Sequence, residues 1–297
     1  MRLGTRRSAL ALAQAKLVAE LLGDCEIVPI VTSGDLGSGP GDKSRWVAAL
    51  EDALAEGRID IAVHSAKDLP GELAEGLELL GAPPRAEVQD VLCGARSLGE
   101  LAPGARVGTS SVRRMAQLRA ARADLEVLAV RGNVDTRLAK LADPDERLDA
   151  IVLARAGLAR LGLHARADGV LEEERFVPAP GQGTLALQGR ASDHRTRAAV
   201  QAISDVPTSA CLLAERTLAR NLGASCHTPL GACATPGTDG ALHLRAWVGL
   251  PDGSAWASDD HLGELSQPEE LAHEVAGRMR AIGAAELLVR AEEMSAG

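Results

Sequence analysis

The sequence predicts an α/β protein with parallel sheets that ends in a small α+β domain. Helix and strand signals alternate along most of the 297 residues, as they do where helices cover parallel sheets. Residues 59–63 form a continuous apolar run bounded by turns, which is typical of a buried parallel strand. From about residue 206 the pattern changes, and a chain of this length usually holds two or three domains.

The individual elements follow from periodicity, capping residues and turn signals. Ser8 can cap the first helix, and Gly57 ends the second. We expect helices at residues 8–22, 45–56, 209–221 and 268–282, the last closing the chain, strands at residues 26–31, 59–63, 106–107, 125–130, 148–154 and 242–248, and a hairpin turn at residues 250–254. Residues 33–44 predict a flexible loop, either a lid or a linker. Its glycines fit a dinucleotide fingerprint poorly, so NAD is not expected.

Composition excludes several classes of function. The net charge is −9, whereas nucleic-acid and membrane-surface binders need a basic face. Aromatic residues make up 1% of the chain, too few for base stacking, and no apolar run approaches the roughly 20 residues of a membrane span. Five scattered cysteines and a start without a signal-peptide-like stretch indicate a cytoplasmic protein with reduced thiols, and no metal site is expected.

Two turns rich in Gly, Ser, Thr and Arg carry the strongest functional signal. Residues 108–114 and 131–137 each follow a strand-like run and lead into a helix-like segment. A helix N-terminus exposes free N–H groups and favours negative charge, and arginine matches carboxylate or phosphate with a planar fork. The turns therefore predict a binding surface for a ligand with several anionic groups. In the alternative, the hydroxyls only cap helices and arginine is the default cation, since only four of the 32 basic residues are lysine.

A second candidate site follows the predicted strand at residues 59–63. Ser65, Lys67 and Asp68 come after this strand, and ligands of open α/β sheets bind at the carboxyl ends of strands. Asp68 beside a cation can act as a general acid and base or hold a substrate ammonium. A salt-bridged surface turn is the alternative for this segment.

Cys226 is the one cysteine with a functional setting. It lies in a loop after a predicted helix, beside His227. This setting allows a nucleophilic or attachment role, although a free cysteine is more often a buried structural thiol.

Six segments in chain order resemble one known family. They are residues 5–8, 63–70, 108–114, 131–137, 180–183 and 226–231. Together they closely resemble the porphobilinogen deaminase (hydroxymethylbilane synthase) family, nearly from end to end. The resemblance implies a monomer of three domains. Two are like the halves of a periplasmic binding protein, joined by a double crossover (residues 1–84 with 182–205, and residues 85–181), and the third (residues 206–297) carries the cofactor cysteine.

The resemblance also implies an activity and the residues that perform it. Members of this family are transferases of heme and tetrapyrrole biosynthesis. They condense four porphobilinogen molecules head to tail on a covalent dipyrromethane cofactor, releasing ammonia and then hydroxymethylbilane. Cys226 matches the thioether attachment residue. Asp68 matches the catalytic aspartate, which protonates the leaving amine and stabilises the cationic azafulvene. The other family positions that contact the cofactor match Ser8, Lys67, Thr109, Ser110, Ser111, Arg113, Arg114, Arg131 and Arg137, and those near the substrate match Arg6, Gln14, Arg160 and Gln182.

The chain departs from the family pattern around the predicted lid. Ser33 replaces an arginine, Trp46 replaces the usual aromatic residue, and Ala48 and Ala49 replace a lysine and a glutamate. Where the family usually has Asp-Pro-Arg-Asp, this chain has Glu87-Val88-Gln89-Asp90, so only the final aspartate is unchanged. Two alternatives therefore stay open: a non-catalytic anion-binding protein on the same fold, and a degenerate paralogue that binds cofactor but turns over poorly.

Overall fold

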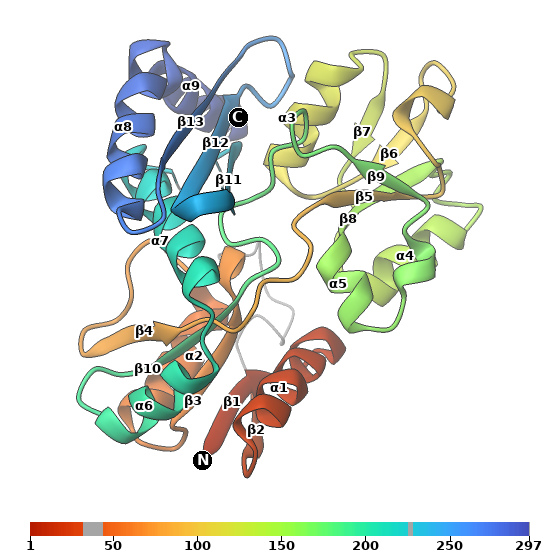
Figure 1. The fold of residues 1–297 in the computed structure, drawn as a ribbon. Coiled ribbons are helices and arrows are strands. Elements are labelled where there is room, and N and C mark those ends of the chain that lie inside the picture. The colour runs from red at the N-terminus through yellow and green to blue at the C-terminus, as the bar shows by residue number, and fades with distance from the viewer. Residues whose placement is uncertain (32–43, 225–227, 297) are drawn as a thin grey trace.

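The computed structural model describes residues 1–31, 44–224 and 228–296. These residues form three units, each built on its own sheet (Figure 1). Two units are five-stranded α/β sheets, and the third is a three-stranded sheet with helices against it. None of the described helices is long and apolar enough to cross a membrane.

The first unit has the strand order β2-β1-β3-β10-β4. Its elements are β1 (Arg2–Arg6), α1 (Ala9–Leu22), β2 (Glu26–Ile30), α2 (Ser44–Ala55), β3 (Ile61–Ser65), β4 (Leu77–Gly81), β10 (Leu185–Arg190) and α6 (His194–Ile203). β1 pairs in parallel with β2 and β3, whereas β10 runs antiparallel to β3 and β4. Val18 of α1 packs with Ile61 on one face, and Leu50 of α2 packs with Ala62 on the other. Helices thus bury both faces of β3, which explains its apolar sequence.

The second unit repeats this arrangement with the strand order β7-β6-β8-β5-β9. Its elements are β5 (Asp90–Cys93), β6 (Arg106–Gly108), α3 (Val112–Ala121), β7 (Glu126–Leu128), α4 (Val134–Ala142), β8 (Ala150–Ala154), α5 (Arg155–Arg160) and β9 (Gly169–Leu171). β5 is antiparallel to both of its neighbours, β8 and β9. Leu118 of α3 packs with Val152, while Leu138 of α4 packs with Ile151 and Leu153, so α3 and α4 cover opposite faces.

The third unit is an antiparallel sheet with helices packed against it. Its elements are α7 (Val206–Asn221), β11 (Leu230–Pro236), β12 (Ala241–Gly249), β13 (Trp256–Glu264), α8 (Pro268–Ala281) and α9 (Ala284–Ala296). Leu244, Val275 and Leu288 belong to one buried core shared by the sheet and the helices. Short 3-10 helices complete the described chain at Ala66–Asp68 (η2), Leu98–Glu100 (η3), His164–Arg166 (η4) and Thr238–Gly240 (η5).

A buried ion pair holds the three units together where the chain crosses between the first two. The Arg85 guanidinium donates to both carboxylate oxygens of Glu215, at 2.7 and 3.1 Å, and to Ala234 O. Glu215 also accepts from the N–H groups of Gly181 and Ala234, both at 2.6 Å. These bonds tie both crossover segments to α7 and β11.

Most predicted elements are present, but several differ from the prediction. The sheets are mixed rather than purely parallel because β5 and β10 return antiparallel. β3 begins at Ile61 rather than at residue 59, since the Ile59 N–H still donates to Ala53 O at the end of α2. α7 begins earlier than predicted because Asp205 caps it by accepting from Thr208 N. The helix expected to close the chain is followed by α9, and most of the predicted loop at residues 33–44 lies outside the described residues.

Candidate active site

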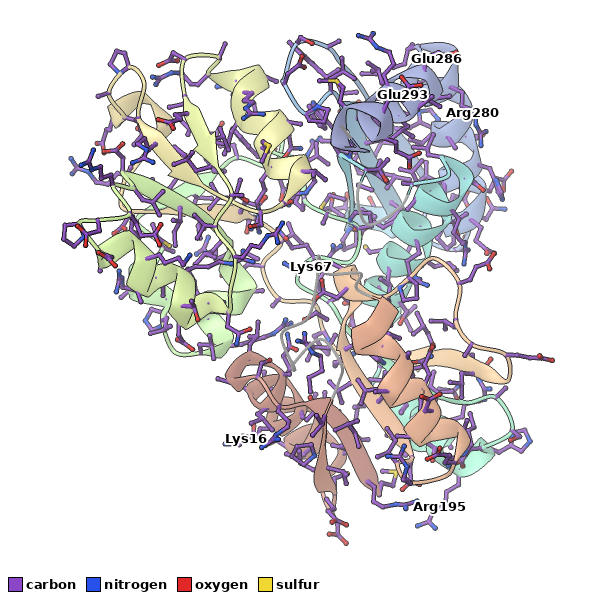
Figure 2. The ribbon with its side chains drawn as sticks, turned by 180° about the vertical axis from the view of Figure 1, so that it is seen from behind. Lys16, Lys67, Arg195, Arg280, Glu286 and Glu293 are labelled. Atoms are coloured by element: carbon purple, nitrogen blue, oxygen red, sulfur yellow. The ribbon has the colours of Figure 1, made fainter. Side chains whose placement is uncertain are left out.

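The described candidate residues come from the end of β1 and from segments that follow β1, β3, β6, β7 and β8, except Gln182, which precedes β10. Asp68 and Lys67 lie in η2, which comes directly after β3, and Figure 2 shows Lys67 in the middle of the molecule. η2 is held by the segment at residues 180–184, because Ala66 N–H donates to Thr184 O at 3.0 Å. Gly181 has a φ of +74°, and a Cβ there would lie 2.8 Å from the Ala66 side chain. Only glycine therefore allows this close approach.

Two glutamines hold side chains at η2, one just before it and one within it. Gln14 is buried and donates from Nε2 to the Ser65 hydroxyl at 2.7 Å. Lys67 Nζ donates to Gln182 Oε1 at 3.2 Å. The predicted substrate glutamines thus position the segment that carries Asp68.

The hydroxyls of the turn before α3 divide between two roles. Ser111 caps α3 by accepting from Arg114 N, and Thr109 accepts from Ser111 N at 3.2 Å. The capping role is observed for Ser111, while the Thr109 hydroxyl stabilises the turn just before the cap. The Ser110 hydroxyl is buried and finds no hydrogen-bond partner among the described residues, so it remains available to a ligand.

Arg113 and Arg114 are buried and share one carboxylate. Arg113 Nη1 lies 2.8 Å from Asp90 Oδ2, and Arg114 Nη2 lies 2.7 Å from Asp90 Oδ1. Gln182 Nε2 donates to the same Oδ1 at 2.8 Å. Burial disfavours the ionised form of Asp90, but the charges and hydrogen bonds of the two arginines outweigh it. The pKa of Asp90 therefore lies far below its ordinary value.

The remaining predicted arginines have different environments. Arg137 donates from Nε to Gly132 O at 2.8 Å. Burial and the charge of Arg114 lower the pKa of Arg137, while the charge of Asp68 raises it. The second predicted turn therefore lies within electrostatic reach of η2. Arg160 donates to Gly183 O at 2.6 Å, and burial lowers its pKa to about 10, so it stays charged near neutral pH.

Three further predicted residues lie at the edges of this region. Arg6 is half-buried at the end of β1, and Arg131 is exposed. Ser8 accepts from Ala11 N and caps α1. The structure thus links Lys67 to Gln182 directly, and Gln182 to the two buried arginines through Asp90. Among the described contacts, Ser8 and Arg131 take no part in that network.

The buried donors fit a ligand that carries carboxylates. The Nε–H groups of Arg113 and Arg114 are buried without a hydrogen-bond partner among the described residues. A buried donor without an acceptor is costly, and a carboxylate accepts well from such groups. A dipyrromethane bearing acetate and propionate groups therefore suits this region. Cys226, its predicted attachment residue, lies outside the described residues.

The residue that sequence reasoning missed is Asp90. It appeared only as an unchanged position in a segment that otherwise departs from the family pattern. Its signal was a lone acidic residue opening the apolar run Asp90–Cys93, all four residues of which are buried. A charge at the start of a fully buried strand needs a partner, and the double arginine was the candidate.

Comparisons with known proteins place the chain in a family. Residues 1–198 match the family model "Porphobilinogen deaminase, dipyromethane cofactor binding domain", and residues 209–281 match "Porphobilinogen deaminase, C-terminal domain". Porphobilinogen deaminase from Deinococcus deserti is 44% identical, with 98% of each chain covered. The protein of the same name from Thermus thermophilus is 43% identical, with 97% of each chain covered.

Solved structures show a weaker likeness. A periplasmic substrate-binding protein from Coxiella burnetii has a TM-score of 0.40 at 15% identity, covering 68% of this chain and 91% of its own. A nutrient-binding protein from Burkholderia cenocepacia has a TM-score of 0.41 at 12% identity, with the same coverage. Neither likeness is strong enough to transfer a function. The family models and the full-length relatives are, and the chain belongs to the porphobilinogen deaminase family.

Proposed function

We propose that the protein condenses four porphobilinogen molecules head to tail on a dipyrromethane bound to Cys226, releasing ammonia and then hydroxymethylbilane. The observation that carries this proposal is the pair of buried arginines with unused Nε–H donors, joined through Gln182 to the segment of Asp68. A protein that only binds anions needs no aspartate at this place.

The roles of the chain's own residues follow from their positions. The bound dipyrromethane supplies the pyrrole carbon to which the first substrate is joined. Asp68 donates a proton to the leaving amine, and its carboxylate then stabilises the positive charge left on the substrate. After the carbon–carbon bond forms, Asp68 accepts the proton that the pyrrole carbon loses. A fixed carboxylate near a developing cation is most effective where the surroundings are partly shielded from water, and Asp68 is half-buried.

The arginines have two roles in this proposal. Arg113 and Arg114 hold cofactor carboxylates because their guanidinium groups are buried and anchored. Arg6 and Arg160 hold the incoming pyrrole or the growing chain. Each added pyrrole brings two more carboxylates, so a second set of cations is needed as the product lengthens.

The thiols support Cys226 as the attachment residue. Burial raises the pKa of Cys93 and of Cys211 to about 11, and it raises the pKa of Cys25 and Cys233 as well. A thiol with a raised pKa forms little of the reactive thiolate. The four described cysteines are therefore poor attachment sites.

The proposal includes an organisation and a location. The three sheets support the division into residues 1–84 with 182–205, residues 85–181 and residues 206–297. A cytoplasmic monomer that binds porphobilinogen, without nucleic acid or membrane as partner, stays part of the same proposal.

One experiment tests attachment and turnover together. The intact mass of the purified protein is expected to exceed the sequence mass by two condensed pyrrole units, and Cys226→Ser is expected to show the bare mass. Incubation with porphobilinogen is expected to give enzyme-bound species with one to three further pyrroles and to release a linear tetrapyrrole. An unmodified wild type that turns over would exclude cofactor attachment. A loaded wild type without product would instead favour the degenerate paralogue.

A second experiment tests the division between the arginines. Arg113→Leu and Arg114→Leu are expected to give protein without cofactor, and Arg6→Leu and Arg160→Leu to give loaded protein that stalls during elongation. Lysine is expected to rescue each site only in part, because it lacks the bidentate fork. Mass spectrometry after a short exposure to porphobilinogen resolves the species. Identical cofactor content and identical intermediates in all four variants would show one undifferentiated positive field.

A further inference from the structure

Asp90 forms a closed cluster with Arg113 and Arg114, which we call the arginine cluster. Asp90 is fully buried, and the two arginines are 4% and 6% exposed. Two guanidinium groups and one carboxylate leave the cluster with an excess positive charge. Because water does not reach these groups, that charge is poorly screened, and one further carboxylate would balance it.

The hydrogen bonds fix how each arginine is turned. Arg113 Nη1 faces Asp90 and also donates to Gln117 Oε1 and to Val177 O, both at 2.9 Å. Arg114 Nη1 donates to Val152 O at 3.0 Å, while its Nη2 binds Asp90. These partners engage Nη1 of Arg113 and both Nη groups of Arg114. The buried Nε–H of each arginine is the donor that they leave unused.

Gln182 connects the arginine cluster to η2. Its Nε2 donates to Asp90 Oδ1 at 2.8 Å and to Val88 O at 2.7 Å, and its Oε1 accepts from Lys67 Nζ. Both ends of the amide are therefore engaged, one in each α/β unit. Gln182 cannot reverse its amide without placing Oε1 against the Asp90 carboxylate.

We propose that Asp90 is a positioning residue, which orients Arg113 and Arg114 before their anionic ligand binds, and that Gln182 transmits this arrangement to Lys67 beside Asp68. This inference rests on the proposed function. It adds that cofactor capture depends on where the Asp90 carboxylate lies, and that cofactor site and acid–base site are coupled through one amide. Asp90 itself does not touch the reacting atoms.

A purely structural ion pair makes a different prediction. If Asp90 only attached α3 to β5, its replacement would lower stability, but the protein that does fold would still carry cofactor. If Asp90 orients the arginines, the folded protein would carry little cofactor. A displacement of about 1 Å from the productive geometry can slow a reaction on the order of a hundredfold, and cofactor attachment is such a reaction.

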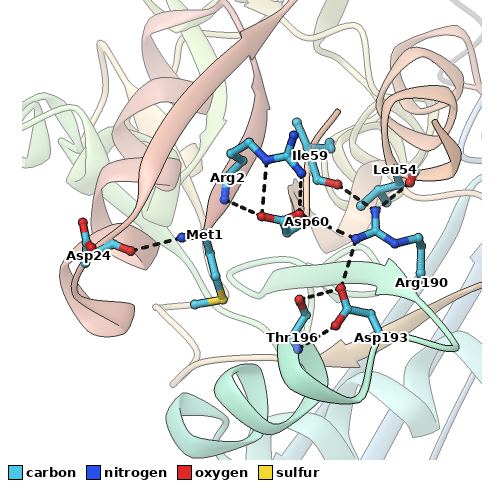
Figure 3. Close-up of polar contacts among 9 residues, drawn as sticks. All are labelled: Met1, Arg2, Asp24, Leu54, Ile59, Asp60, Arg190, Asp193 and Thr196. Atoms are coloured by element: carbon cyan, nitrogen blue, oxygen red, sulfur yellow. Dashed lines mark hydrogen bonds and ion pairs between the residues drawn. The ribbon is translucent and has the colours of Figure 1, made fainter. Parts of the chain in front are cut away.

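The test uses two substitutions at Asp90 and one matched control. Asp90→Asn removes the charge, and Asp90→Glu keeps the charge but moves the carboxylate by one methylene. Asp60→Asn is the control, because Asp60 also lies between two arginines, Arg2 and Arg190, away from the candidate site (Figure 3). Each protein is purified, checked for cooperative unfolding, and weighed intact to measure the fraction that carries the two-pyrrole addition.

If Asp90 positions the arginines, both Asp90 variants are expected to lose at least about tenfold in cofactor content. Asp60→Asn is expected to stay fully loaded. A folded Asp90→Glu with wild-type loading would overturn the proposal, since charge alone would then suffice. If Asp90→Asn does not fold, Asp90→Glu still decides the question, because it leaves no arginine without a counter-charge. An unloaded wild type would instead contradict the proposed function itself.

Gln182→Met tests the connection to η2. Methionine keeps the length of the side chain but leaves Lys67 Nζ and Asp90 Oδ1 without the amide, while the arginine pairs remain. We expect full cofactor loading, a kcat lowered by roughly tenfold, and a smaller change in KM. Wild-type kcat in a fully loaded Gln182→Met would show that the two sites are not coupled through this residue.

Discussion

Asp60 and Asp90 each lie between two arginines, yet their surroundings differ. The Asp60 side chain is 20% exposed, and its partners Arg2 and Arg190 are 41% and 24% exposed. The partners of Asp90 are nearly inaccessible. One aspartate and two arginines thus form a solvated group at one place and a buried cluster at the other. Residue type alone does not tell a structural pair from a binding site.

The hydrogen bonds of the arginines make the distinction. Arg190 donates to Leu54 O, to Ile59 O and to Asp193, while Asp193 caps α6 by accepting from Thr196 (Figure 3). Both Nη groups of Arg190 thus donate to acceptors within the protein. In the arginine cluster both Nε–H groups are buried without a hydrogen-bond partner in the described part of the chain. Unused buried donors are costly to the folded protein, so they indicate a ligand.

The largest difference between the two regions is expected in stability. Arg113→Leu leaves Asp90 with one buried arginine instead of two, and breaking a buried ion pair typically costs about 3–5 kcal/mol. Chemical denaturation of the unloaded protein measures this loss, with Arg190→Leu as the comparison. An equal loss in both variants would show that burial does not separate the two regions.

Catalysis is expected to separate the two ends of β3. Asp60 precedes this strand and Asp68 follows it. Asp68→Asn keeps the size but removes the charge and the exchangeable proton, so turnover is expected to fall by roughly two orders of magnitude or more. Asp60→Asn is expected to leave turnover unchanged. Both proteins are loaded with preassembled tetrapyrrole before the assay, and near-normal turnover in Asp68→Asn would remove Asp68 from the mechanism.

Local features of this region could be predicted from the sequence, and long-range ones could not. The cap at Ser111 and the turn before α3 follow from neighbouring residues. The pairing of Gln182 with Asp90 joins residues 92 positions apart, and no local pattern encodes it. The return of β10 between β3 and β4 is also a property of the whole sheet. α9 is a different case, because its buried Leu287, Leu288 and Ala291 recur at helical spacing. This helix could therefore have been predicted from the sequence.

A buried histidine, His64, is expected to set the response of stability to acid. His64 on β3 bonds through Nε2 to Gln188 Oε1 at 2.9 Å, and Gln188 Nε2 donates to Glu51. Burial lowers the pKa of His64 to about 4, against opposing contributions from Gln188 and Asp68. As the pH falls below about 6.5, His64 therefore binds a proton in the unfolded chain but stays neutral in the folded protein. Stability from this group is complete above pH 6.5 and is lost as the pH falls towards 4.

Neither Asp60 nor Asp90 adds to the loss of stability between pH 6.5 and 4, because their pKa values lie below the ordinary value and both keep their full stabilising effect in that range. Their stabilising effect is lost only at lower pH. The His64 contribution at pH 5 is about 2 kcal/mol. Urea denaturation at pH 7.5 and pH 5 is expected to show a loss of this size that His64→Gln lacks. A variant that loses as much stability as the wild type would assign the acid response to other groups.

The smallest effect is expected at the exposed pair, and salt is the means to detect it. Arg2 binds Asp60 with two side-chain hydrogen bonds, at 2.8 and 3.5 Å, and the pair lies in contact with solvent. Exposed ion pairs contribute little and are screened as ionic strength rises. Arg2→Leu is therefore expected to lower stability only slightly at low salt, by much less than Arg113→Leu, and the difference from the wild type is expected to shrink further in high salt. The Arg113→Leu deficit is expected to persist in high salt, because ions do not reach a buried cluster. If both deficits vanished together, the arginine cluster would be open to solvent, and its unused donors would no longer indicate a ligand.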